Sequence, residues 1–84
     1  MKVYVLEPKN NMELCKYLKE KNIYVSTLTL ADVVIVDKVI NIRTSLDLVD
    51  NALMNGKEIL CFKNKYARDN YVSNHLIKDG ARYI

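Results

Sequence analysis

The chain is poor in the residues that several common kinds of site require. It holds two glycines, one proline, one histidine, two cysteines and no tryptophan among 84 residues. The turn expected over residues 7–11 has no glycine, so its backbone cannot approach a pyrophosphate as the dinucleotide-binding fingerprint requires. A single histidine and two cysteines far apart in the chain do not form the spaced ligand sets of metal sites. The sequence therefore predicts no nicotinamide or flavin cofactor and no metal ion.

Long apolar runs are also missing. No stretch approaches the ~20 apolar residues of a membrane-spanning helix, and Met1-Lys2 leads straight into an expected strand without the apolar core of a signal peptide. Half of the residues are hydrophobic, which is typical of a folded domain and not of a disordered chain. We expect a single cytoplasmic domain over residues 1–84. Because a domain of this size buries only about 60% of its unfolded surface, we also expect a homo-oligomer.

Apolar runs and helical patterns alternate along the chain. Runs rich in apolar and β-branched residues predict strands at 3–6, 23–27, 33–36, 59–62 and, at one edge of the sheet, 82–84. Helical spacing predicts three helices between them: one after Asn10, one over residues 45–55 and one from Asp69 or Asn70 to a stop at Gly80. This alternation is typical of a three-layer, Rossmann-like α/β domain with a mostly parallel sheet of four or five strands.

The first and last helices are predicted to be amphipathic. Asn10 and Glu13 have the spacing of a capping box at the start of the first helix. Its apolar face consists of Leu14, Cys15 and Leu18. The last helix has a similar face, which consists of Val72, Leu76 and Ile77. Because Cys61 falls in an expected strand, we expect Cys15 and Cys61 to be two buried free thiols.

The chain is organised around the helix that follows its most apolar run, residues 33–36. Thr44 or Ser45 is a natural N-cap of this helix, and Gly56 suits the left-handed position just past its end. We expect its inward face to consist of Leu46, Val49, Ala52 and Leu53. A helix N-terminus at the carboxyl edge of a parallel sheet attracts anions. The sequence therefore predicts a phosphate site made by Lys38, Arg43, Thr44 and Ser45.

Three further side chains are candidates for contacts to the rest of a nucleotide. Asp37 ends the buried strand at the carboxyl edge of the sheet, where its carboxylate can accept from a ribose hydroxyl; a solvated carboxylate is the alternative. Tyr66 and Tyr71 flank the entry to the last helix, where either ring can stack on a base. Packing over the edge of the sheet is the alternative for both rings.

The positive charge is concentrated in the last third of the chain. Residues 1–56 hold seven basic and seven acidic side chains, whereas residues 57–84 hold six basic and three acidic ones. Lys63, Lys65 and Arg68 crowd an expected loop together with Tyr66, an arrangement that suits phosphate or single-stranded nucleic acid. A solvated loop of cations is the alternative interpretation.

Several short motifs stand in order from residue 31 onward: Ala31-Asp32-Val33-Val34-Ile35-Val36, Ser45-Leu46, Ala52-Leu53, Gly56-Lys57-Glu58-Ile59, Asn74, Leu76-Ile77 and Gly80-Ala81-Arg82. Through them, residues 31–84 resemble the second half of the Rossmann-like domain of the DNA-processing protein A (DprA/Smf) family, within the wider SMF/DprA–LOG (SLOG) nucleotide-binding superfamily. The resemblance implies binding of DNA or of a nucleotide, with contacts from Ser45 and Asn74. This chain departs from the family by having Thr44 in place of a glycine and by lacking the phosphate-binding first half.

A second resemblance, to nucleoside deoxyribosyltransferases, bears on catalysis. The corresponding helix of those enzymes carries a nucleophilic glutamate four residues before an alanine, and four residues before Ala52 stands Leu48. Leucine has no lone pair with which to attack a sugar or to abstract a proton, so glycosyl transfer through this position is excluded. We therefore expect a protein that is not an enzyme.

Three functions stay open. The first is a non-catalytic module that senses or sequesters a nucleotide or another phosphate-bearing small ligand at the N-terminus of helix 45–55. The second is single-stranded DNA binding through Lys63, Lys65 and Arg68. The third is an assembly module in which sheet edges pair subunits and no small molecule binds.

Overall fold

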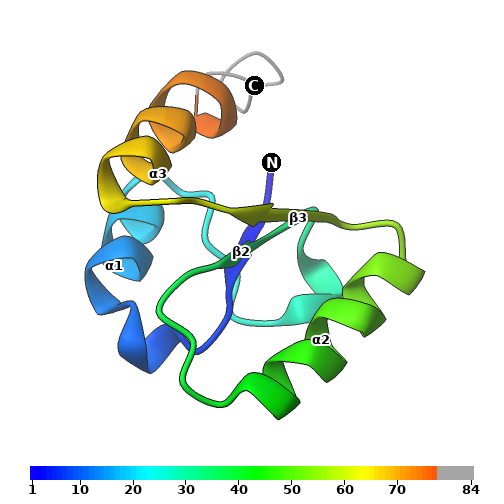
Figure 1. Cartoon of the computed structure of the whole chain (residues 1–84). Helices are drawn as coiled ribbons and strands as arrows, with labels where there is room; N and C mark the ends of the chain where they lie inside the picture. The colour runs from blue at the N-terminus through cyan, green and yellow to red at the C-terminus, as the bar shows by residue number, and fades with distance from the viewer. Residues whose placement is uncertain (78–84) are drawn as a thin grey trace.

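Figure 1 shows a computed structural model of the chain, which describes residues 1–77. The elements follow in the order β1 (Val3–Val5), η1 (Pro8–Asn10), α1 (Met12–Glu20), η2 (Leu28–Leu30), β2 (Val33–Val36), α2 (Ile42–Met54), β3 (Glu58–Cys61), α3 (Lys65–Tyr71) and η3 (Val72–Ile77). Here η1 and η2 are single turns of 3₁₀ helix, and η3 continues α3 as a π-helical segment. The helix stop expected at Gly80, the strand expected over 82–84 and the side chain of Ile77 lie outside what the structure describes.

The three strands form one parallel sheet in the order β1-β2-β3. The apolar strand β2 is therefore central, as predicted. The stretch 23–27 was expected to be a strand, but within residues 1–77 it contributes one bridge, from Tyr24 to Val3 on the free side of β1. β1 is only three residues long because the chain turns away at Glu7. Few of its backbone groups are therefore available to pair with another strand. The described residues thus form three strands and not the four or five expected.

Helices cover both faces of the sheet, which gives the three layers that the sequence predicted (Figure 1). Alternation along β2 explains this, because successive side chains of a strand point to opposite faces. The core on the side of α1 and of η3, which continues α3, consists of Val3, Val5, Leu14, Cys15, Leu18, Ile23, Val33, Ile35, Val72 and Leu76. The smaller core under α2 consists of Leu6, Val34 and Ala52. The inward faces predicted for the first helix, and for Val72 and Leu76 in the last, are confirmed.

The central helix α2 differs from its prediction at its start and in its inward face. Asn41 is the N-cap and accepts from the backbone N–H of Thr44, so the helix begins at Ile42 and neither Thr44 nor Ser45 caps it. The residues that face the sheet are Ser45, Leu48, Val49 and Ala52. Leu46 and Leu53 are exposed, because the small side chains of Ser45 and Ala52 bring another face of α2 against the sheet. The predicted end is confirmed, with Gly56 at a left-handed φ of 74°.

The other two helices also begin at different residues from those predicted. Asn11, and not Asn10, occupies the N-cap position of α1, and its side chain makes no capping bond. Asn64 caps α3 by accepting from the backbone N–H of Ala67, several residues before the expected caps Asp69 and Asn70. The expected basic loop is therefore mostly the first turns of a helix.

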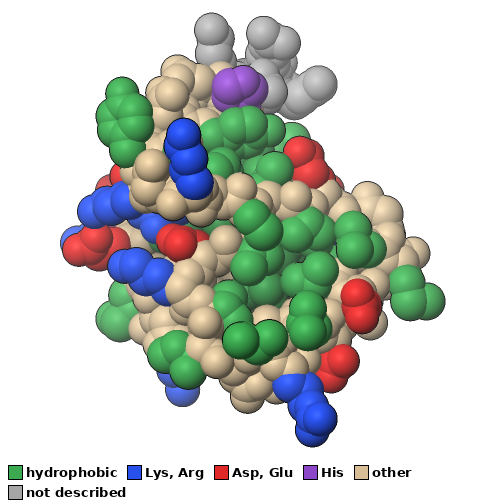
Figure 2. All heavy atoms as spheres, viewed as in Figure 1, with side chains coloured by type: hydrophobic (Ala, Val, Ile, Leu, Met, Phe, Trp, Pro, Cys, Tyr) green, Lys and Arg blue, Asp and Glu red, His purple; other side chains and the backbone are tan. Residues whose placement is uncertain are grey.

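Several apolar side chains remain exposed. Figure 2 shows hydrophobic side chains gathered over the face of the molecule that α2 and β3 share. Cys61 is exposed and Cys15 is buried, so the expectation of two buried thiols is wrong for Cys61, which lies in β3, at the edge of the sheet that residues 1–77 form. Among the helices of residues 1–77, none combines the length and the apolar character needed to cross a membrane.

Candidate functional site

The carboxyl ends of β1 and β2 border the candidate site. From β1 the chain leads to α1 and the Tyr24 bridge on one side, and from β2 it leads to α2 and β3 on the other. In open α/β sheets, ligands bind in the crevice at such a reversal of direction. The residues beyond the two strands, beginning with Leu6 and Asp37, and the N-terminus of α1 meet at this edge.

Asn11 links the chain segments that meet at this edge of the sheet. Its Nδ2 donates to the backbone oxygens of Leu6 at 3.1 Å, Glu7 at 3.2 Å and Asp37 at 2.8 Å. The residue is 4% exposed, and its Oδ1 has no hydrogen-bond partner within residues 1–77. A buried acceptor without a donor costs free energy. Asn11 therefore presents an unused acceptor at the start of α1.

Glu7 fills the N-terminus of α2, where the sequence predicted phosphate. Its carboxylate accepts from the backbone N–H groups of Ile40 and Asn41, each at 3.0 Å, and from Ser45 Oγ at 3.2 Å. Glu7 makes these contacts from a left-handed φ of 49°, which non-glycine residues seldom adopt. An external anion at this end of α2 would therefore meet a carboxylate of the protein itself.

Asp37 and Arg68 form an ion pair at the same edge. Arg68 Nη1 donates to Asp37 Oδ2 at 2.5 Å, and Arg68 Nε donates to Asp69 Oδ1 at 3.0 Å. Arg68 is buried. The sequence suggested that Asp37 contacts a ribose and that Arg68 belongs to a basic loop that binds phosphate or single-stranded nucleic acid. In the structure they bind each other, which offsets the charge of Arg68.

Glu13, in the first turn of α1, lies close to several cations. Lys65 Nζ is 3.3 Å from Glu13 Oε2. This hydrogen bond and the charge of Lys65 lower the pKa of Glu13, and the charges of Lys38 and Arg68 lower it further. Three cations that are distant in sequence therefore surround the start of α1.

Of the hollows that border the first turn of α1, two are lined by Lys9. The first, which we call the basic hollow, has a volume of about 310 Å³. It is lined by Lys9, Asn10, Asn11, Met12, Glu13, Leu14, Lys38 and Arg68. Of the four residues predicted to hold phosphate, Lys38 alone lines it. Its position suits an anion, because a helix N-terminus and cations meet there.

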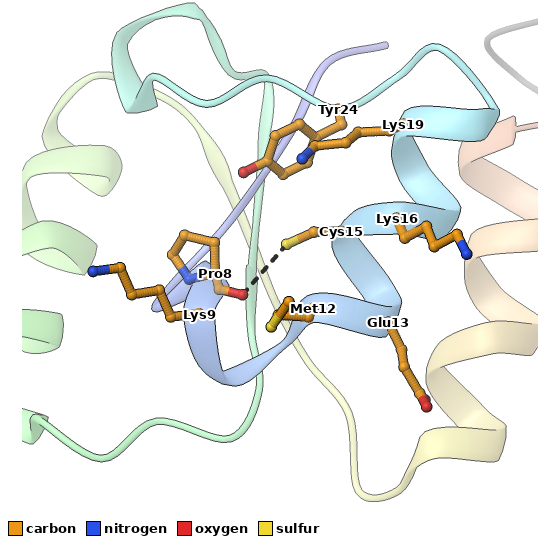
Figure 3. A pocket seen from close by; sticks show the side chains of 8 residues that line it. All are labelled: Pro8, Lys9, Met12, Glu13, Cys15, Lys16, Lys19 and Tyr24. Atoms are coloured by element: carbon orange, nitrogen blue, oxygen red, sulfur yellow. Dashed lines mark hydrogen bonds between the residues drawn. The ribbon is translucent and has the colours of Figure 1, made fainter.

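The second hollow, which we call the apolar hollow, has a volume of about 480 Å³ and is lined by Pro8, Lys9, Met12, Glu13, Cys15, Lys16, Lys19 and Tyr24. Figure 3 shows Cys15 between Pro8 and Tyr24, while Lys9 and Lys16 point outward. The Cys15 thiol donates weakly to the Pro8 oxygen at 3.9 Å, and Lys19 Nζ lies 5.1 Å from the centre of the Tyr24 ring. Burial raises the pKa of Cys15 and that of Tyr24, so both side chains are neutral. The two hollows share Lys9, Met12 and Glu13.

The remaining predicted residues lie elsewhere. Arg43 and Thr44 are exposed on the first turn of α2, and Lys63 and Tyr66 are exposed near the start of α3. The rest lie further along the last helix. Tyr71 packs on Phe62 and stacks on His75, and Asn74 donates to Asn70. The helices run opposite to the strands. The end of the last helix, with Tyr71 and Asn74, therefore lies away from the carboxyl edge of the sheet.

Sequence reasoning missed four residues of the site: Glu7, Asn11, Cys15 as a lining residue, and Tyr24. Glu7 and Asn11 stand in the turn between a strand and a helix, and this place in a βα unit was the available signal. Leu48, at the position of the catalytic glutamate in deoxyribosyltransferases, lies half-buried on the face of α2 that packs on the sheet. In residues 1–77 no group of three histidine, cysteine or acidic residues is arranged to hold a metal ion.

Comparison with protein-family models, with curated proteins and with solved structures yields no match to this chain.

Proposed function

We propose that the protein is a non-catalytic binding module for a nucleotide or another phosphate-bearing small ligand, which it senses or sequesters. The ligand binds at the carboxyl edge of β1 and β2. The observation that carries this proposal is the basic hollow, which is lined by Lys9, Lys38, the N-terminus of α1 and Asn11. The buried amide oxygen of Asn11 has no donor within residues 1–77.

Phosphate occupies the basic hollow in this proposal. The exposed side chain of Lys38 and the dipole of α1 favour an anion there. Asn11 Oδ1 is buried in the structure, and in this proposal the Asn11 side chain turns so that this atom accepts from a hydroxyl or amino group of the ligand, which nucleotides supply. The N-terminus of α2, which we expected from the sequence to bind phosphate, is a poorer choice because Glu7 occupies it.

The base lies in the apolar hollow. Met12, Pro8 and the Tyr24 ring present apolar surface there, and rings stack well on tyrosine. Because the two hollows share Lys9 and Met12, one ligand can reach both. Each hollow has the volume of a small-ligand site. Tyr24 thus takes the role that the sequence suggested for Tyr66 or Tyr71.

The chemistry of the hollows supports binding without catalysis. The Cys15 thiol is held protonated by burial, whereas a cysteine nucleophile needs its thiolate. His75 stacks on Tyr71 in the last helix, away from this edge. Leu48 offers no group for glycosyl transfer.

Calorimetric titration with a panel of nucleotides, including cyclic and ADP-ribose types, tests the proposal. We expect a dissociation constant below about 1 mM for at least one member. Replacing Lys38 by Met should then weaken binding by about 10- to 150-fold, the loss of one charge-assisted bond. Lys63→Met is the matched control, since Lys63 is exposed and lines neither hollow. Absence of binding across the panel contradicts the proposal.

Alkylation of the two thiols gives a second measurement of the same binding. A ligand in the apolar hollow should slow the reaction of Cys15 with N-ethylmaleimide, because Cys15 lines that hollow. Cys61 is exposed in β3 and should react at the same rate with and without ligand. Equal slowing of both thiols would place the ligand elsewhere.

Single-stranded DNA binding remains the alternative function. Lys65 pairs with Glu13 and Arg68 pairs with Asp37, so two of the three cations proposed for this function already have partners. Oligonucleotide titration at two salt concentrations tests it. A slope of about −0.7 per phosphate contact on a log–log plot, together with loss of affinity in Lys63→Met, would favour DNA.

We further propose a cytoplasmic location and a homo-oligomeric state, both of which we expected from the sequence. Fractionation of cells and sedimentation of the purified protein test them. The third hypothesis, an assembly module, requires the same oligomer and would be favoured if neither nucleotides nor DNA bind.

A further inference from the structure

Helix α2 carries an apolar stripe in addition to the face that packs on the sheet. The stripe consists of Ile42, Leu46, Val49 and Leu53, which are spaced by four, three and four residues. Ile42 is 66% exposed, Leu46 58% and Leu53 57%. This spacing is the one by which two helices pack along a seam.

The stripe is not part of the domain's own core. Ser45, Leu48 and Ala52 form the centre of the face that packs on the sheet, and Val49 lies on the boundary between that face and the stripe. In Figure 2 the hydrophobic side chains over α2 join those over β3, so apolar surface continues from one element to the other. Contiguous apolar surface of this kind marks an interaction site.

We propose that this stripe is the interface between two copies of the chain, which pack their α2 helices antiparallel about a two-fold axis. In that arrangement Ile42 lies opposite the partner's Leu53, and Leu46 lies opposite the partner's Val49. The surface is self-complementary, as an interface in a symmetric dimer must be. The inference does not depend on which ligand the carboxyl edge binds.

The charges beside the stripe select the antiparallel orientation and the second copy as the occupant. Arg43 and Asp50 are seven residues apart, so both flank the same side of the stripe near its two ends. An antiparallel pair of helices brings Arg43 of each copy opposite Asp50 of the other, which forms two ion pairs. A parallel pair would place Arg43 and Asp50 of each copy beside the opposite flank of the partner's stripe, so neither ion pair would form.

Sedimentation of the full chain across a range of concentrations tests the interface. We expect a dimer for the natural sequence. Leu46→Lys and Leu53→Lys should each raise the dimer dissociation constant by at least about tenfold, because each places a charge in an apolar seam. The matched control is Met54→Lys: Met54 lies on the same helix and is 87% exposed, but it lies off the stripe and should leave the constant unchanged.

A charge swap tests the orientation and keeps the inference falsifiable if a lysine variant fails to fold. Arg43→Asp and Asp50→Arg should each raise the dissociation constant by about two- to thirtyfold through two symmetric pairs. The double variant that carries both changes should restore it. Circular dichroism of each variant reports whether the fold is kept. A natural chain that is monomeric at ~1 mM, a dimer insensitive to the lysine variants, or a double swap that restores nothing would overturn the inference.

Discussion

The carboxylate of Glu7 accepts a hydrogen bond from the hydroxyl of Ser45 at 3.2 Å, although the two residues stand 38 positions apart. Glu7 follows β1 and Ser45 lies in the first turn of α2, so the contact joins the two βα units of the domain. The backbone N–H groups of Ile40 and Asn41 bind the same carboxylate. Glu7 thus holds the loop after β2 in place and supplies the negative charge that a helix N-terminus attracts.

Glu7→Ala should therefore destabilise the protein by about 1–3 kcal/mol, since hydrogen bonds to a charged acceptor are lost and partly replaced by water. Urea unfolding measures the change. Glu20→Ala is the control, because Glu20 is exposed at the end of α1 and its removal should cost less than about 0.5 kcal/mol. Equal losses in the two variants would mean that Glu7 does not anchor α2.

Removing Asp37 should cost more than removing an exposed acid, because Arg68 is buried beside it. Breaking a fully buried ion pair costs about 3–5 kcal/mol. Asp37→Ala should cost somewhat less, about 2–4 kcal/mol, since Asp69 still accepts from Arg68. The comparison is with Asp47→Ala, an exposed position on α2. A loss no larger than that of Asp47→Ala would mean that the pair is solvated.

The Glu13 carboxyl should titrate below its ordinary pKa of 4.5, because Lys65 binds its charged form. A carboxyl whose pKa is lowered in the folded state stabilises the fold at pH values above the pKa of the unfolded state. That contribution disappears as the pH falls through the pKa of the folded state. Carbon-detected NMR of the glutamate carboxyls measures it. Lys65→Ala should return the Glu13 pKa toward 4.5. An unchanged titration curve in that variant would contradict the contact.

Leu18→Ala and Leu53→Ala should differ in their effect on stability. Leu18 is fully buried on the inward face of α1, whereas Leu53 is exposed on α2. The first change should cost about 2–5 kcal/mol through the cavity it leaves. The second should cost less than about 1 kcal/mol when unfolding is measured at a concentration where single copies prevail. Similar losses would mean that α2 packs on the sheet through the face first predicted.

Stability should fall at high pH because of Cys15. Burial raises the pKa of this thiol above its ordinary 9.0, so the folded state keeps a proton that the unfolded state releases. The contribution of this protonated thiol to the free energy of unfolding is complete below pH 9, and it is lost as the pH rises toward the pKa of the folded state. Unfolding in urea between pH 8 and about 10.5 measures it. Cys15→Ala should flatten this decline, although the raised pKa of Tyr24 will preserve part of it.

The sequence by itself determined the layers of the domain and much of its core. β2 is a continuous apolar run, so it had to lie at the centre of the sheet with both faces covered. The spacing of Leu14, Cys15 and Leu18 placed one face of α1 inside. These features are local, because the period of apolar residues within one element is enough to predict them.

Only the tertiary structure decided which face of α2 packs on the sheet. Leu46 and Leu53 on one face of this helix and Leu48 and Ala52 on the adjacent face are all apolar, so periodicity could not choose between the two faces. The choice depends on how closely the helix approaches the sheet, which the small side chains of Ser45 and Ala52 allow.

The tertiary structure also decided which residues form the candidate site. A helix N-terminus predicts an anion, but not whether that anion is a ligand or a carboxylate from elsewhere in the chain. Arg68 likewise was predicted to lie in a basic loop, but it forms a partly buried ion pair with Asp37, 31 positions away in the sequence. Such contacts join residues that are distant in sequence, and their formation depends on the packing of whole elements, which no local pattern encodes.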